Sequence, residues 1–184
     1  MLHSGRRKAL FLIGSLIIGF LILYGFGSFA IGIAFALIWF DKVIIGVFEP
    51  VRYVGVELTT AGTVLLALAL GPVNAFLISL VIIPVLHAVK HIALPIGDPE
   101  WPLFLPSPYD AVNALGAAAA GLVAGLPLFW VIAITALAKV LFYAIADTQI
   151  LRKPIDFMGG VTTVVFNVTA GWLVLAYFAG VAGL

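Results

Sequence analysis

Residues 58–89 read LTTAGTVLLALALGPVNAFLISLVIIPVLHAV, a stretch that contains no aspartate, glutamate, lysine or arginine. Three further stretches share this property, at 9–40, 111–138 and 157–184. A helix that crosses the hydrocarbon core of a bilayer needs about 20 apolar residues, and each of the four stretches is longer than that. The pattern predicts an all-α protein, a polytopic helical membrane bundle.

The overall composition supports the same class of protein. Hydrophobic residues make up 64% of the 184 residues and charged residues 9%, whereas soluble domains are about 45–50% apolar and about 25% charged. The formal net charge of +1 predicts no nucleic-acid partner. The absence of cysteine excludes disulfides, thiolate metal sites and cysteine nucleophiles. We expect one integral membrane domain over 1–184, with a basic tail at 1–8 and a proline-rich polar loop at 87–108.

Glycine and proline divide the long apolar stretches into separate spans. We expect breaks at Gly25, Gly71 and Gly125, because glycine ends helices and proline suits the first turn of the next helix. The start of the chain is basic and then apolar, like a signal peptide, but no polar cleavage region follows, so we expect a retained span. The expected spans are 9–25, 28–48, 54–70, 72–89, 109–125, 127–146 and 157–181. This makes about six or seven transmembrane helices in hairpins with tight Gly/Pro turns, since a break can also be a kink within one helix.

The basic residues indicate an orientation in the membrane. Seven of the nine lysines and arginines lie at the N-terminus or in the longer loops, at positions 6–8, 52, 90 and 152–153. The other two, Lys42 and Lys139, lie within expected spans, and none lies in the expected tight turns. Because basic residues favour the cytoplasmic side, we predict a multi-pass protein of the cell membrane with a cytoplasmic N-terminus. A short turn also has little room for charge, which would produce the same distribution.

Besides Lys42, whose simplest role is to extend its stem towards the interface, four charged residues fall within the expected spans, where charge is costly and usually functional. Lys139 lies about 18 Å into its span at 1.5 Å per residue, and Asp41 lies at a similar depth, so Asp41 is its expected ion-pair partner. Glu57 lies near the start of span 54–70, and Asp110 opens span 109–125. We predict all four as ligand-binding residues. The alternative is structural: Asp41 fixes the helix register, and Lys139 extends its stem towards the interface.

Asn167 is a polar residue in the middle of the last expected span, within VTTVVFNVTAGW. A hydrogen bond between helices is its simplest role, and ligand contact is the alternative. The sequence Asn167-Val168-Thr169 matches a glycosylation sequon, but a segment inside the bilayer is not an acceptor.

Residues 87–110, HAVKHIALPIGDPEWPLFLPSPYD, gather much of the polar chemistry of the chain. His87 and His91 are four residues apart and share one face of a helix. Together with Asp98 and Glu100 they suit a metal ion. The alternative is a helix C-terminus, where the dipole favours histidine and lysine.

Trp101 lies in the proline-rich part of this loop. The prolines prevent a continuous helix, and tryptophan suits the membrane interface. Two interpretations are possible: the loop covers the bundle and contacts a ligand through Trp101, or it is a plain connector at the membrane interface.

Small residues recur at four-residue spacing in two expected spans, which permits close helix packing. They are Ala30 and Ala34, Gly32 and Ala36, and Gly116, Ala120 and Ala124. Packing within the bundle is the simpler interpretation, and docking to a partner membrane subunit is the alternative.

Three segments carry a resemblance to a known family: VGVELTTAGTVLLALALGPVNAFLISLVIIP, PSPYDAVNALGAAAAGLVAG and FNVTAGWLVLAYF. They resemble parts of the S components, the substrate-binding membrane subunits of energy-coupling-factor vitamin transporters. The resemblance covers 28–184 and leaves 1–27 as an extra helix. It implies a six-helix bundle with Glu57, Asp110 and Asn167 as ligand contacts. It also places the charged loops outside, opposite to the orientation that the basic residues predict.

The sequence therefore predicts a small-solute membrane transport protein, the substrate-binding subunit of a vitamin-type transporter. Its expected partners are the lipid bilayer, a small polar solute, a transmembrane subunit and a separate ATPase, since no GxxxxGK[ST] motif is present. The first alternative is an intramembrane enzyme for a lipid or isoprenoid substrate, with chemistry at His87, His91, Asp98, Glu100 and Asp147. The second is an accessory structural subunit of a membrane complex. No cofactor or catalytic residue is assigned.

Overall fold

A computed structural model describes residues 5–25, 27–48, 55–94, 96, 99 and 101–184. Within these ranges the chain forms seven continuous helical segments and no strand. Five segments are long and apolar enough to cross a membrane: 5–24, 29–47, 72–93, 128–151 and 157–182. The all-α fold predicted from the charge-free stretches is confirmed, and the five long helices are compatible with a multi-pass membrane protein.

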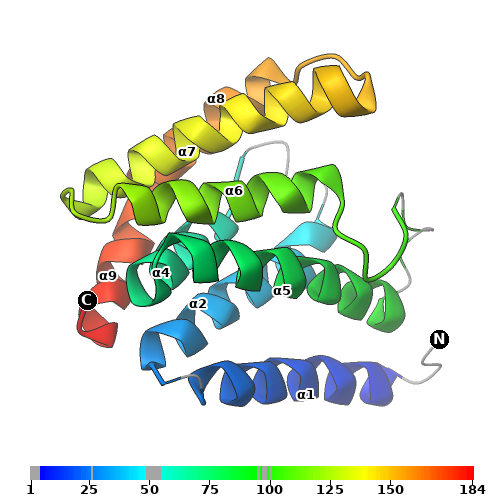
Figure 1. The fold of residues 1–184 in the computed structure, drawn as a ribbon. Helices are drawn as coiled ribbons and strands as arrows, with labels where there is room; N and C mark the ends of the chain where they lie inside the picture. The colour runs from blue at the N-terminus through cyan, green and yellow to red at the C-terminus, as the bar shows by residue number, and fades with distance from the viewer. Residues whose placement is uncertain (1–4, 26, 49–54, 95, 97–98, 100) are drawn as a thin grey trace.

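The helices follow one another in an up-and-down order (Figure 1). The first four segments are α1 (Gly5–Tyr24), α2 (Phe29–Trp39) with its continuation η1 (Phe40–Ile44) and η2 (Ile45–Val47), α4 (Thr59–Leu70) and α5 (Pro72–Ala93). The last three are α6 (Pro108–Leu122), α7 (Leu128–Ile145) with η3 (Ala146–Leu151), and α8 (Phe157–Phe166) continued by η4 (Asn167–Gly171) and α9 (Trp172–Ala182). The basic residues at 6–8 lie within α1, and the residues from His87 to Ala93 belong to α5.

Local sequence chemistry explains where several of these helices begin. Ser28 caps α2 by accepting a hydrogen bond from the Ala30 N–H at 3.1 Å. Between α4 and α5 the chain reverses at Gly71, whose φ of 77° favours glycine, and Pro72 is the first residue of α5. Helices α4 and α5 are therefore joined at Gly71 with almost no loop between them.

The two ends of the bundle differ. At one end, shown at the left of Figure 1, lie the short connections α1–α2, α4–α5 and α6–α7, together with the C-terminus. At the other end α5 and α7 finish, α6 begins, and the described chain starts at α1 (Figure 1). We call this second end the polar end, because almost every charged side chain of the described chain lies there.

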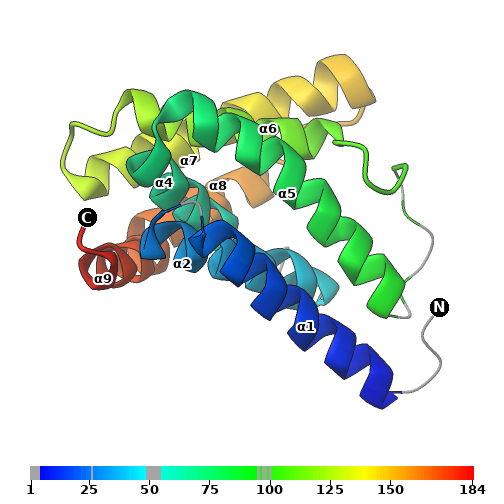
Figure 2. The same cartoon turned by 60° about the horizontal axis from the view of Figure 1, so that its bottom comes forward.

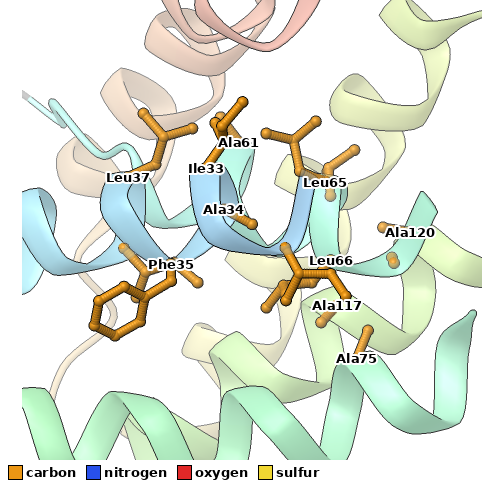
Figure 3. Close-up of a cluster of buried hydrophobic side chains, with 14 of the residues drawn as sticks. Ile33, Ala34, Phe35, Leu37, Ala61, Leu65, Leu66, Ala75, Ala117 and Ala120 are labelled. Carbon is orange, nitrogen blue, oxygen red and sulfur yellow. The ribbon is translucent and has the colours of Figure 1, made fainter. Parts of the chain in front are cut away.

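Helix α4 forms the centre of the bundle. It contacts α2, α5, α6, α7 and α9, and all its residues from Thr59 to Ala67 are buried. Figure 3 shows its apolar side chains Ala61, Leu65 and Leu66 between residues of α2, α5 and α6. Helix α4 has only 12 residues, about 18 Å at 1.5 Å per residue. The expected span 54–70 is therefore shorter in the structure and begins inside the bundle.

The outer helix surfaces are apolar and exposed. Ile18 on α1 is 60% exposed, Val81 on α5 64% and Leu141 on α7 64%. Figures 1 and 2 both show α1 on the outside of the bundle beside α2. Contiguous apolar surface on this scale marks contact with lipid or with another protein rather than with water.

The small-residue faces pack inside the bundle. A Cβ on Gly32 of α2 would meet the ring of Phe20 on α1 at 2.8 Å, and a Cβ on Gly62 of α4 would meet the carbonyl oxygen of Ala34 at 2.9 Å. The two faces of α2 are thus covered by α1 and α4. A partner subunit would have to contact a different surface.

Candidate functional site

The polar end contains a cavity of about 830 Å³. Its walls come from η1 and η2, the residues before α4, and helices α5, α6, α7, η3 and α8. The predicted site residues that line it are Asp41, Glu57, His87, His91, Trp101 and Asp110. The other two, Lys139 and Asn167, are fully buried behind it.

Lys139 forms an ion pair with Glu57 in the interior of the bundle. Its ammonium also contacts the hydroxyl of Thr60 at 2.6 Å and lies 5.9 Å from the centre of the Tyr143 ring. The prediction that Asp41 pairs with Lys139 is wrong, because Glu57 occupies that position. Glu57 reaches it because α4 starts deep in the bundle, so the residues just before α4 lie beside the middle of α7.

The stem of Lys139 crosses α6 at Gly116. A Cβ on Gly116 would lie 2.6 Å from Cγ of Lys139 and 2.8 Å from its Cδ. Only glycine leaves room for the lysine to pass along α6 and reach Glu57. Gly116 in α6 therefore allows the ammonium group of Lys139 to reach Glu57.

Asp41 stabilises the start of α4. Its carboxylate accepts a hydrogen bond from the Leu58 backbone N–H at 2.9 Å and another from the Thr59 hydroxyl, and it lies 3.3 Å from the ammonium of Lys42. A negative charge at the N-terminal end of a helix is favourable because of the helix dipole. Asp41 thus serves as a cap supplied by another helix. We call Asp41, Lys42, Glu57 and Lys139 the α4 ion cluster.

Glu57 itself lies outside the spanning helices, in the connection before α4. Burial is the largest single influence and raises the pKa of its carboxyl, but the positive charges of Lys139 and Lys42 and the hydrogen bonds from Lys139 and Thr60 together outweigh it, so the pKa lies below its ordinary value. Glu57 is therefore held ionised as the counter-ion of Lys139.

His87 and Asp110 face each other across the cavity wall. The His87 Nδ1 lies 3.3 Å from a carboxylate oxygen of Asp110, which is 1% exposed. Ser107 and Asp110 form a capping box: the Ser107 N–H donates to the Asp110 carboxylate at 2.8 Å, and the Ser107 hydroxyl accepts from the Asp110 N–H at 3.2 Å. Asp110 thus holds the first turn of α6 and one histidine at once.

The metal-binding prediction concerns His87 and His91. Both line the cavity, but the described residues contain no group of three or more His, Cys, Asp or Glu side chains that could hold a metal ion. Asp98 and Glu100, the two acids that completed the predicted set, lie outside the described residues.

Asp147 is a buried carboxylate that the sequence analysis considered only for an enzyme. It is 8% exposed and accepts a hydrogen bond from the Tyr109 hydroxyl at 2.7 Å. The ring of Tyr109 lies 5.7 Å from the ring of Tyr143, centre to centre. All three side chains line the cavity, and we call them the aromatic-carboxylate wall. The sequence does not predict that these three residues lie together, because Tyr109 is distant in the chain from the other two.

Asn167 begins the π-helical segment η4 and is fully buried. Its side-chain NH₂ donates to the Thr163 carbonyl at 2.9 Å, one turn earlier in the same helix, and not to another helix as predicted. Its side-chain oxygen accepts no hydrogen bond from the described residues. The ligand-contact role of Asn167 remains a prediction.

Each of the three π-helical segments carries one buried polar residue: Asp41 in η1, Asp147 in η3 and Asn167 in η4. A π-turn widens a helix locally and is common at functional sites. Trp101, in contrast, is 41% exposed and lies on the rim of the cavity. The structure brings Asp41, Glu57, His87, His91 and Asp110 together around the cavity, buries Lys139 and Asn167 behind it, and leaves Trp101 at its rim.

Fold and site together define a class: an all-helical protein with five membrane-length apolar helices and a charged cavity at one end. Comparison of the chain with protein-family models, curated proteins and solved structures finds no match.

Proposed function

We propose that this chain is a multi-pass membrane protein that binds a small solute in the polar-end cavity and takes part in its transport. The cavity is the observation that carries the proposal. Its volume of about 830 Å³ falls within the range of about 300–1,000 Å³ that small-molecule sites occupy. Its walls combine apolar residues with a few polar groups that converge from distant parts of the chain, as such sites do.

The buried charges support a binding role over a merely structural one. The bundle core needs no ions for packing, and each buried charge must be compensated. Nevertheless several charged groups line this cavity rather than the lipid-facing surface. In this proposal the protein is the solute-binding subunit of a vitamin-type transporter, and a partner subunit with a separate ATPase supplies the energy.

The proposed topology has six or seven membrane crossings arranged in hairpins, with α4 as a short central helix. The short connections lie at one end and the cavity at the other. Following the basic residues, the N-terminus and the mouth of the cavity are cytoplasmic.

The binding proposal is tested with the purified full chain in lipid nanodiscs. Small molecules that remain bound are released by denaturation and identified by mass spectrometry, and their affinity is then measured. Ala144 lines the cavity, so the substitution Ala144→Trp should abolish binding by filling it. The matched control is Leu137→Trp, on the same helix but 53% exposed on its outer side, which should bind normally. A parent protein with no saturable solute, or undiminished binding by Ala144→Trp, contradicts the proposal.

The topology is tested by labelling with a membrane-impermeant maleimide, which the lack of cysteine makes specific. Leu105→Cys marks the polar end and Leu126→Cys the opposite end; both leucines are exposed, at 58% and 46%. We expect Leu126→Cys to react in intact cells and Leu105→Cys only after permeabilisation. The reverse result overturns the orientation and agrees with the one implied by the S-component resemblance.

A further inference from the structure

The charge balance of the cavity favours a cationic ligand. Its described lining contains the carboxylates Asp41, Glu57, Asp110, Asp147 and Asp156, but only the ammonium groups Lys42 and Lys90. A cleft lined with an excess of one charge, between walls of low dielectric, concentrates ligands of the opposite charge.

Four of these carboxylates have an evident structural role. Asp41 caps α4, Glu57 pairs with Lys139, Asp110 closes the capping box of α6, and Asp156 caps α8 by accepting the Gly159 N–H at 2.8 Å. Each of them is thus compensated by a cation or by a helix N-terminus.

Asp147 is the exception. Its side chain accepts one hydrogen bond, from the neutral hydroxyl of Tyr109, and among the described residues no lysine, arginine or histidine forms an ion pair with it. A carboxylate that is buried to this degree is costly without a compensating positive charge. The cavity in front of Asp147 provides the space for that charge.

The neighbours of Asp147 suit an organic ammonium group in particular. The Tyr109 and Tyr143 rings meet at 55° and present π-electron surface beside the carboxylate. The Lys139 ammonium already lies near the Tyr143 ring, at 5.9 Å, so this ring accepts a cation nearby. Aromatic rings combined with a carboxylate recognise amines and quaternary ammonium ions through cation–π attraction and charge.

We propose that the solute is a small organic cation, and that its ammonium group binds against the aromatic-carboxylate wall of Tyr109, Tyr143 and Asp147. This inference rests on the proposed function, because it names the class of solute that the cavity takes. The α4 ion cluster then holds the cavity open from the other side and takes no part in recognising the ammonium group.

The test uses the full chain in nanodiscs and probes that differ in charge but little in shape. Choline and phenyltrimethylammonium are the cationic probes, and 3,3-dimethylbutan-1-ol, in which carbon replaces the quaternary nitrogen of choline, is the neutral control. Binding is measured by ligand-observed NMR titration. We expect choline to bind at least about tenfold more tightly than the alcohol, from one ion pair and ring contact.

Variants then locate the site. Asp147→Asn keeps an acceptor for the Tyr109 hydroxyl and should weaken choline about tenfold without affecting the alcohol. Asp156→Asn, which removes another carboxylate of the lining, should change choline affinity less than about threefold. Tyr143→Leu, which removes the ring, should bind choline more weakly, and Tyr143→Phe, which retains the ring, should lose less affinity than Tyr143→Leu.

The outcomes separate this inference from the proposed function. If the cavity retains a solute that Ala144→Trp loses, but neither cationic probe binds or choline binds no better than the alcohol, the cation inference is overturned and the transport proposal stands. Unchanged choline affinity in Asp147→Asn overturns the inference in the same way. If no solute binds the cavity at all, both fail.

Discussion

Two polar regions of the cavity differ in how their buried charges are compensated. In the α4 ion cluster, the charges of Glu57 and Lys139 neutralise each other directly, and Asp41 is compensated by Lys42 and the N-terminus of α4. In the aromatic-carboxylate wall, Asp147 has one neutral hydrogen-bond donor and two aromatic rings nearby. The charges of the first region are compensated within the chain, and in our proposal those of the second are compensated by a ligand. The comparison predicts that the first region maintains the fold and the second selects the solute.

The largest effect on stability is expected for Lys139→Met. Methionine preserves the apolar stem but leaves the Glu57 carboxylate buried without its counter-ion, and breaking a buried ion pair in this way costs about 3–5 kcal/mol. The measurement is the free energy of unfolding in mixed detergent micelles during an SDS titration. The double variant Glu57→Gln with Lys139→Met should recover at least half of the loss, because no uncompensated charge remains. A double variant as unstable as the single one would show that the pair does not act as a unit.

A smaller effect is expected for Gly116→Ala, which leaves every charge in place. The new methyl group would overlap the Lys139 stem, and such overpacking costs about 1–3 kcal/mol. The matched control is Gly180→Ala in α9, where no atom lies within 4 Å of the added Cβ, and where alanine should be neutral or stabilising by about 0.5–1 kcal/mol. Equal stability of the two variants would mean that the lysine stem does not need the space at Gly116.

The smallest effect is expected for Asp147→Asn, in the other region. The amide oxygen still accepts the Tyr109 hydroxyl, and no ion pair among the described residues is lost. The free energy of unfolding should stay within about 1 kcal/mol of the parent value, although choline affinity falls. Destabilisation as large as that of Lys139→Met would assign Asp147 to the structural framework and remove the distinction between the two regions.

The prediction of the fold class succeeded because hydropathy is a local property. The charge-free stretches require helices of membrane length wherever they lie, and each of the five observed long helices overlaps one of these stretches. The length of α4 could not be read in the same way. Its sequence is as apolar as that of its neighbours, but its start is set by Asp41, a residue of another helix that receives the Leu58 N–H.

The sequence predicted which residues line the candidate site better than it predicted which of them pair with each other. Glu57, Asp110 and Asp41 do line one cavity, because charges in an apolar chain gather where water or partners are available. The partner of Lys139 was predicted wrongly from depth alone, since depth ignores how α4 is placed against α7. The sequence did not predict Asp147 as a ligand-binding residue, because Tyr109 is far from it in the chain and their contact depends on the fold.

The sequence by itself determined that this protein is an apolar helical bundle whose charges are confined to a few segments, since the free energy of burying a residue depends mainly on its own chemistry. Only the tertiary structure decided which charges neutralise each other and which carboxylate faces the cavity without an ion-pair partner among the described residues. An ion pair or a hydrogen bond forms only when its two groups lie within a few ångströms of each other, so these pairings depend on how helices that are far apart in the chain are placed together.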